Sequence, residues 1–210
     1  MLLNITDTVS VFKLIAADIE ANKEYLTELD TAIGDADHGI NMSRGFSVLL
    51  PKFDGDFAAI GDVFKVAATT LISTVGGASG PLYGTLFLKM AGTLNSEETD
   101  LQGFCTALSI GIDGVKARGK AEKGEKTMLD VLIPVLESLQ ASASNGVSEA
   151  DAYEKAVEIA KEGYEFTKTI IATKGRASYL GERSLGHIDP GSMSAYLMIK
   201  AIADYGSGRR

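Results

Sequence analysis

The chain has 210 residues, of which 45% are hydrophobic and 23% are charged, and its formal net charge is −8. This composition is typical of a folded protein with one domain, residues 1–210, and excludes an intrinsically disordered chain. The negative charge argues against direct binding to nucleic acid, because phosphate backbones attract basic surfaces. No apolar run approaches the ~20 residues that cross a bilayer, and no signal peptide is apparent.

Only one cysteine, Cys105, is present, among apolar neighbours. A single cysteine excludes an internal disulfide framework and fits a reducing compartment. We therefore expect a cytoplasmic protein without a membrane partner, in which Cys105 is a core thiol.

Apolar residues recur with helical spacing along most of the chain, and no segment shows the alternation that is typical of a strand. The stripes fall within residues 9–19, 40–50, 57–71, 81–93, 100–117, 131–139, 152–166 and 193–201. Thr127 and Ser148 are suitable N-caps, and Pro190 suits the first turn of a helix. The sequence predicts an all-α fold, an antiparallel bundle or barrel of about eight helices.

Four connections between these helices are rich in glycine or charge: residues 30–39, 76–84, 119–126 and 174–191. In an up-and-down bundle, alternate connections emerge at the same end. These four follow alternate predicted helices, so we expect them to meet at one mouth.

Asp30, Asp35 and Asp37 stand close together in the first of these connections. Neighbouring carboxylates repel one another, so a fold that gathers them usually supplies a cation. Gly34 and Gly39 would let the backbone bend around the cluster. A helix follows directly, and a helix N-terminus also attracts phosphate. The segment predicts a site for a hard metal and a phosphate, with capping aspartates on a solvated loop as the alternative.

An EF-hand does not explain the cluster. Counted from Asp35, that loop needs a glycine at the sixth position and a glutamate at the twelfth, where the chain has Ile40 and Phe46. Magnesium, completed by phosphate oxygens and water, is favoured instead. His38 has a structural or nucleotide-contacting role in this interpretation, since magnesium prefers oxygen.

The glycine-rich segment 73–81 precedes a predicted helix and contains Ser79. Backbone N–H groups in such a turn bind anions, although a tight helix–helix turn would explain it equally well. Residues 114–121 nearly match a P-loop, but Ala121 replaces the metal-binding hydroxyl and a helix precedes the segment in place of a strand. Its basic residues form either a solvated loop or the rim of a nucleotide site: Lys116, Arg118, Lys120 and Lys123.

Residues 174–191 are too long and polar for a simple connection, and loops of this kind are often lids. Arg176 would neutralise phosphate charge, and the turn Asp189–Pro190–Gly191 would meet a nucleotide at the last helix. A disordered surface loop is the alternative.

With these loops in view, the chain resembles the L subunits, which carry ADP, of the bacterial dihydroxyacetone kinases that depend on the phosphotransferase system. The resemblance rests on four blocks: GDADHGINMSRGF at 34–46, VGGASGPLYGT at 75–85, GVKARGKAEKGEKTMLDV at 114–131 and KGRASYLGERSLGHIDPGS at 174–192. It implies an antiparallel eight-helix barrel that holds ADP or ATP and two Mg²⁺ ions at one end.

The resemblance also implies the role of individual residues. Asp30, Asp35 and Asp37 match the family's magnesium ligands, and no further catalytic residue is implied in this chain. The nucleotide contacts implied are His38, Gly39, Ile40, Asn41, Ala78, Ser79, Gly119, Met128, Arg176, Asp189, Pro190 and Gly191.

The implied activity is that of a phosphotransferase subunit that works only with partners. Its nucleotide would receive phosphate from a phosphohistidine on a donor subunit and pass it to dihydroxyacetone on a partner subunit. Two alternatives stay open: a kinase of the same fold that exchanges ATP freely, and a regulatory module that binds a transcription factor. A homodimer is compatible with each.

Overall fold

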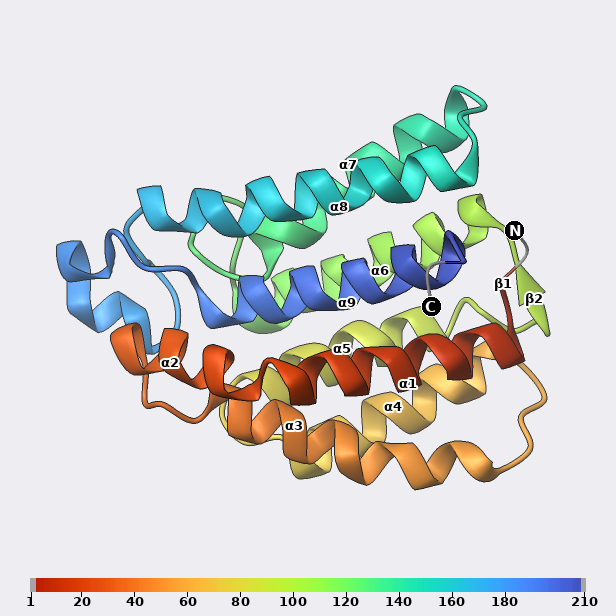
Figure 1. Ribbon diagram of the computed structural model, residues 1–210, viewed down its shortest axis with the longest axis horizontal. Helices are drawn as coiled ribbons and strands as arrows, with labels where there is room; N and C mark the ends of the chain where they lie inside the picture. Colours follow the sequence, from red (N-terminus) through yellow and green to blue (C-terminus); the bar gives the residue numbers. More distant parts are fainter. Residues whose placement is uncertain (1–2, 209–210) are drawn as a thin grey trace.

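The computed structural model describes residues 3–208, and almost all of them lie in helices or in the connections between helices (Figure 1). The α-helices are α1 (Ile5–Ala21), α2 (Lys23–Ile33), α3 (His38–Leu49), α4 (Ile60–Thr74), α5 (Ser79–Ala91), α6 (Leu101–Gly119), α7 (Leu129–Ser144), α8 (Glu149–Phe166) and α9 (Pro190–Gly206). Short 3-10 helices are η1 (Leu50–Asp54), η2 (Thr167–Thr169) and η3 (Arg176–Ser184). No helix among the described residues is long and apolar enough to span a membrane.

The predicted all-helical fold is confirmed, with two local differences. A single residue, Asn22, separates α1 from α2, so this pair occupies the place of the first predicted helix and extends it to Ile33. Two-residue strands β1 (Leu3–Asn4) and β2 (Glu98–Thr99) form an antiparallel pair, which is too short for sequence alternation to reveal.

The predicted helix ends are partly right. Ser148 caps α8 by accepting the N–H of Asp151, and Pro190 begins α9. Thr127 lies one residue before Met128, which borders α7, but it makes the capping contacts expected of it. Its Oγ1 accepts the N–H of Leu129 at 3.2 Å, and the carboxylate of Asp130 accepts the N–H of Thr127 at 2.7 Å, the two bonds of a capping box.

Most helices pack mainly against their neighbours in sequence, whereas α1 packs mainly on α9 and α3. Glycine permits one of the closest approaches, because a Cβ on Gly163 of α8 would lie 2.5 Å from the carbonyl oxygen of Asp130 in α7. One continuous hydrophobic core runs through the bundle. Cys105 is buried in this core, as predicted, and burial raises the pKa of its thiol.

The connections segregate by end. Those between α2 and α3, α4 and α5, α6 and α7, and α8 and α9 lie at the left of Figure 1. The β1–β2 pair and the turns between α3 and α4, α5 and α6, and α7 and α8 lie at the right. We call these the mouth end and the opposite end.

Candidate functional site

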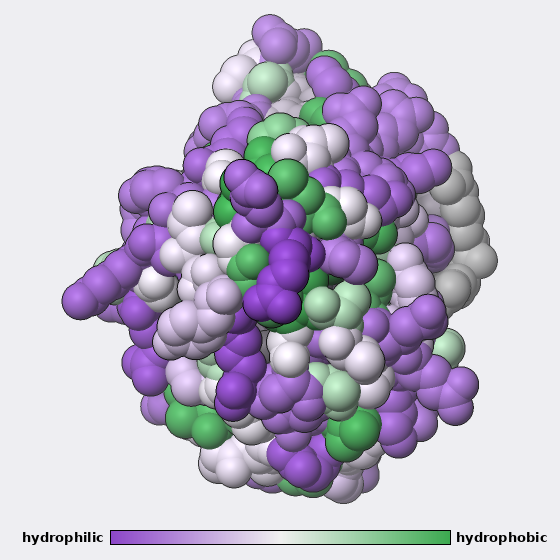
Figure 2. Space-filling view, turned by 90° about the vertical axis from the view of Figure 1, so that its left-hand side faces the viewer, coloured by the Kyte–Doolittle hydropathy of each residue, from purple (hydrophilic) through white to green (hydrophobic). Residues whose placement is uncertain are grey.

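A cleft of about 730 Å³ opens at the mouth end, and residues of all four connections line it. The prediction of one shared mouth is therefore confirmed. Figure 2 views this end and shows strongly hydrophilic groups near the middle of the face, with apolar groups beside them. A largely apolar cleft with a few converging polar groups is the usual form of a small-molecule site.

The three predicted aspartates converge at this cleft. Asp30, Asp35 and Asp37 each offer a carboxylate oxygen, and these oxygens lie within 4.8 Å of one another. Asp30 is buried, Asp37 is half-buried and Asp35 is exposed. This set contains only hard oxygen donors, which is the chemistry that Mg²⁺ prefers.

Asp30 also holds the loop that carries the other two carboxylates. Its Oδ2 accepts the backbone N–H of Asp37 at 2.8 Å and that of His38 at 3.0 Å. A Cβ on Gly34 would lie 1.9 Å from Oδ1 of Asp30, so only glycine allows the carboxylate to reach the loop. Ala36 has φ 63°, a conformation that costs energy for a residue with a side chain.

Gly39 does not bend the backbone, in contrast to the sequence interpretation, because it lies within the first turn of α3. Its small size serves packing: a Cβ there would lie 2.0 Å from the carbonyl oxygen of Lys23. This glycine therefore lets the start of α3 contact α2.

His38 is buried within a hydroxyl network. Its Nδ1 lies 2.9 Å from Oγ of Ser79, and its Nε2 lies 3.0 Å from Oγ of Ser194. Ser194 also shares a 2.7 Å hydrogen bond with the hydroxyl of Tyr83. Burial lowers the pKa of His38 to about 4, so the imidazole is neutral at pH 7. With both ring nitrogens engaged, His38 joins α3, α5 and α9, which favours its structural role.

The glycine-rich turn contributes Gly76, Gly77, Ala78 and Ser79 to the lining. Gly77 has φ 65°, and α5 begins two residues later at Ser79. The N-cap, Ala78, has no side-chain oxygen that could accept the first N–H groups of the helix. A helix start of this kind at a cleft is suited to bind an anion.

The connection between α8 and α9 is ordered and crosses the mouth. It contains η3, and Arg176 forms an ion pair with Asp35 at 2.9 Å. Glu125 of the α6–α7 loop accepts from Thr173 Oγ1 at 3.0 Å and lies 3.4 Å from Nζ of Lys174. The alternative of a disordered loop is therefore wrong, and a guanidinium reaches the carboxylate cluster.

The turn before α9 lines the same cleft. Asp189 caps the helix by accepting the N–H of Ser192 at 2.6 Å, and Pro190 and Gly191 begin the first turn. Burial raises the pKa of Asp189 to about 7. Gly119 and Met128 also belong to the lining.

Three residues implied by the resemblance lie outside the lining: Gly39, Ile40 and Asn41. Ile40 is 47% exposed, whereas Asn41 is buried and accepts a 2.6 Å hydrogen bond from Arg44. The basic residues of the α6–α7 region were predicted to form either a solvated loop or the rim of the site, and the structure shows some of each. Arg118 lines the cleft, and Lys116 forms an exposed ion pair with Glu122 at 2.8 Å.

The sequence interpretation missed several residues at or beneath the cleft, namely Tyr83, Lys126 and Ser194. Each is almost completely buried, with at most 1% of its surface exposed. Tyr83 and Ser194 appear as ordinary members of helical stripes, and Lys126 is one of several lysines in its loop. Their positions arise only from contacts between distant segments.

Comparison with known proteins places the chain in a family. The DAK2 domain matches residues 32–204. The PEP-dependent dihydroxyacetone kinase, ADP-binding subunit DhaL, of Escherichia coli K12 is 49% identical over 86% of this chain and 87% of the relative. The ADP-binding subunit of PEP-dependent dihydroxyacetone kinase 1 of Listeria innocua is 48% identical over 88% of each chain.

Longer proteins match over part of their length. Triokinase/FMN cyclase of Rattus norvegicus is 35% identical over 92% of this chain, which corresponds to 34% of that protein. The crystal structure of the dihydroxyacetone kinase from C. freundii in complex with AMP-PNP and Mg²⁺ superposes with a TM-score of 0.72 and 26% identity. That match covers 94% of this chain and 33% of the other.

The helical fold and the length of these matches define a DAK2-domain protein. The chain belongs to the DAK2-domain family and, within it, to the group of dihydroxyacetone kinase ADP-binding subunits. The family resemblance inferred from the four sequence blocks is therefore confirmed.

Proposed function

We propose that this chain is the nucleotide-carrying subunit of a dihydroxyacetone kinase. It holds ADP or ATP with two Mg²⁺ ions, receives phosphate from a phosphohistidine donor subunit and passes it to dihydroxyacetone on a partner subunit. One observation carries the proposal: three aspartate carboxylates converge within 4.8 Å in a cleft that the glycine-rich turn also lines. The printed names of the relatives, kinase subunits that bind ADP, support it.

The carboxylates of Asp30, Asp35 and Asp37 would hold the metal, whose chemistry is to neutralise phosphate charge. Arg176 already contacts Asp35, so its guanidinium is placed to bind phosphate when a cation occupies the cluster. The helix start at Ala78 and Ser79 would hold further phosphate oxygens through backbone N–H groups.

The remaining cleft residues would hold the rest of the nucleotide. Gly119 and Met128 would face the base, and the turn Asp189–Pro190–Gly191 would close the pocket. Within the segment His38–Asn41, the His38 ring is engaged by Ser79 and Ser194, and the backbone N–H groups of His38 and Asn41 donate to Asp30 and Asp37. A phosphate at the start of α3 would therefore be held through the backbone of Gly39 and Ile40. Phosphoryl transfer needs mainly position and charge neutralisation, so these groups suffice when partner subunits supply donor and acceptor.

A second candidate is a kinase of the same fold that exchanges ATP freely. The match to rat triokinase/FMN cyclase favours it, because this chain corresponds to one part of a longer enzyme there. A regulatory role with a transcription factor or a homodimeric state is compatible with either candidate. For both, we propose a single domain, residues 1–210, that works in the cytoplasm.

The two candidates differ in how they hold nucleotide. Mass spectrometry of the purified chain identifies what it retains, and incubation with isotope-labelled ATP and Mg²⁺ measures exchange. Retained ADP that does not exchange over hours supports the carrier. Rapid exchange supports the second candidate, and protein that binds neither nucleotide contradicts both.

A further inference from the structure

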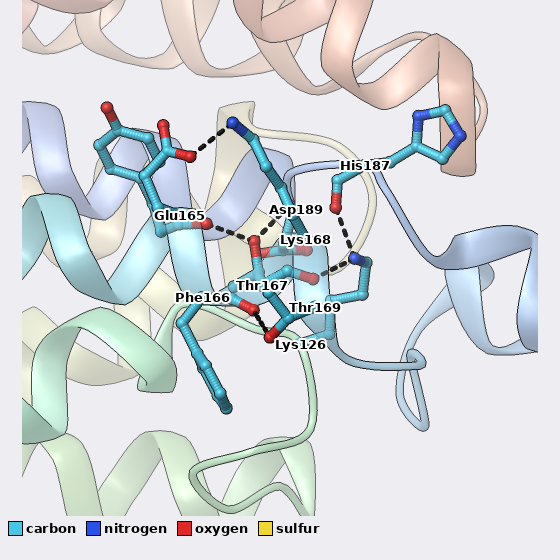
Figure 3. A network of polar contacts seen from close by, with 9 residues as sticks. Lys126, Glu165, Phe166, Thr167, Lys168, Thr169, His187 and Asp189 are labelled. Atoms are coloured by element: carbon cyan, nitrogen blue, oxygen red, sulfur yellow. Dashed lines mark hydrogen bonds and ion pairs between the residues drawn. The ribbon is translucent and has the colours of Figure 1, made fainter.

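A lysine is buried beneath the cleft. Lys126, in the loop between α6 and α7, is only 1% exposed. Its Nζ donates to the backbone carbonyl of Thr167 and to that of His187, the latter at 2.5 Å (Figure 3). It also lies 3.5 Å from the carbonyl oxygen of Ile170. All three acceptors belong to the connection between α8 and α9, near its two ends.

This arrangement costs free energy of folding. Burying an ammonium group costs free energy, and burial lowers the pKa of Lys126, whereas the charges of Asp189 and Asp130 act in the opposite direction. Lys126 also has φ 62°, which is strained for a residue with a side chain. Strain of this kind persists where the surroundings enforce it, and it is concentrated at functional sites.

The carboxylate of Asp130 enforces the strained loop. It is 1% exposed and accepts the N–H groups of Gly124 at 2.5 Å and Thr127 at 2.7 Å, on both sides of Lys126. These bonds fix the backbone so that the lysine side chain points toward the connection (Figure 3).

Lys126 contacts both ends of the long connection between α8 and α9. Between Thr167 and His187 the chain passes through η3 and carries Arg176 across the mouth. Two further hydrogen bonds join the same ends, residues 167–168 and 186–189, which we call the neck of the connection. The N–H of Asp189 donates to Oγ1 of Thr167 at 3.1 Å, and the N–H of Gly186 donates to the carbonyl of Lys168 at 2.8 Å. The turn that begins at Asp189 follows directly and lines the cleft.

We propose that Lys126 is a positioning residue that controls nucleotide retention, by tying the neck of the α8–α9 connection to the α6–α7 loop. The inference rests on the proposed function. The tie holds the Asp189 turn against the cleft and keeps Arg176 over its mouth. Without it, the connection opens more often, and nucleotide leaves faster through the mouth.

The test compares three variants. Lys126→Met nearly keeps the length of the side chain but removes its charge and its hydrogen-bond donors. Lys126→Arg keeps the charge and the donors. Lys168→Met is the matched control, because Lys168 lies in the same connection but pairs with Glu165 at the surface. Stopped-flow release of a fluorescent ADP derivative with Mg²⁺ measures the dissociation rate. We expect release about 10-fold faster or more for Lys126→Met, partial rescue in Lys126→Arg and the wild-type rate in Lys168→Met.

A second variant removes another bond of the same neck and leaves both the lysine side chain and its backbone acceptors in place. Thr167→Val deletes the acceptor for the N–H of Asp189 together with a local donor to the carbonyl of Tyr164, and we expect release about 3-fold faster. Its effect should not add to that of Lys126→Met, since both open one neck. This variant decides the question if Lys126→Met does not fold.

Hydrogen exchange without nucleotide gives an independent readout. Residues 167–191 should exchange faster in Lys126→Met, and the core of α5 should be unchanged. A variant with a lower melting temperature but wild-type release and wild-type exchange in 167–191 would overturn the inference and leave the lysine a structural role. Wild-type protein that binds no ADP would overturn the proposed function, and the role in retention with it.

Discussion

The two ends of the bundle are built on different principles. The mouth end gathers carboxylates, glycines and long polar connections around a cleft of about 730 Å³. Toward the opposite end, aromatic rings pack in the interior: Phe12 lies 5.2 Å from Phe64 and 5.3 Å from Phe87 between ring centroids. The cavity there is apolar and measures only about 70 Å³.

Backbone strain follows the same division. In residues 3–208, the non-glycine residues with positive φ are Ala36, Lys120 and Lys126, and all three lie in connections at the mouth. Strained conformations are retained where they serve a site, and close packing elsewhere compensates for their cost. The residues that stabilise the bundle and the residues of the candidate site therefore lie mainly in separate parts of one fold. Mutations at the two ends can test this separation.

The largest effect on stability should come from the aromatic packing. Phe12→Ala removes a ring with 2% exposure and enlarges the apolar cavity that Phe12 lines. We expect the free energy of unfolding to fall by about 3–5 kcal/mol. Urea denaturation measures this fall, with the exposed Val147→Ala as the control, which should change little. ADP affinity of the folded variant should stay within about 3-fold, and a larger loss would contradict the separation of the two ends.

The second-largest effect is expected at the mouth, where a substitution should reduce binding and activity but not stability. Asp35→Asn removes one exposed carboxylate of the cluster. We expect Mg²⁺ affinity and phosphoryl transfer with partner subunits to fall by about 100-fold or more. Stability without metal should change little, because the relief of repulsion within the cluster offsets the loss of the exposed ion pair with Arg176. Titration calorimetry and a coupled assay measure the losses, and Asp56→Asn at the opposite end is the matched control. Transfer at the wild-type rate would argue against a metal at these residues.

A smaller effect should appear in the pH dependence of stability. The pKa of Asp189 is raised from 3.8 to about 7, so the folded state binds this proton more tightly than the unfolded state does. Its contribution to stability is therefore lost as pH rises from 4 to 7. Asn is an equally good N-cap and does not titrate. Between pH 4 and 7, Asp189→Asn should gain on the order of 2 kcal/mol relative to wild type.

Urea denaturation of both proteins in EDTA without nucleotide measures this difference. The exposed Asp56→Asn variant should run parallel to wild type over the same pH range. Parallel curves for Asp189→Asn would show that Asp189 ionises as readily in the folded protein as in the unfolded chain.

Much of the fold was readable from the sequence because it depends on local periodicity. The apolar stripes predicted the helices, and their order predicted that four connections share one end. The break at Asn22 was not readable, because residues on both sides continue a helical pattern.

The candidate site was only partly readable. Asp30, Asp35 and Asp37 lie so close in sequence that the end of α2 and the short loop after it bring them together. Gly39 was misread because its value is close packing against Lys23 of another helix, which the local sequence does not encode. The pairing of Arg176 with Asp35 likewise joins distant loops.

By itself, then, the sequence determined the helices, the carboxylate cluster and the family, since each is written in residues that are neighbours along the chain. Tertiary structure alone decided which polar side chains are buried and what they join. His38 bridges two serines of different helices, and Lys126 holds the carbonyls of Thr167 and His187. The reason is physical: a buried polar group needs partners with fixed geometry, and only the packed bundle supplies them.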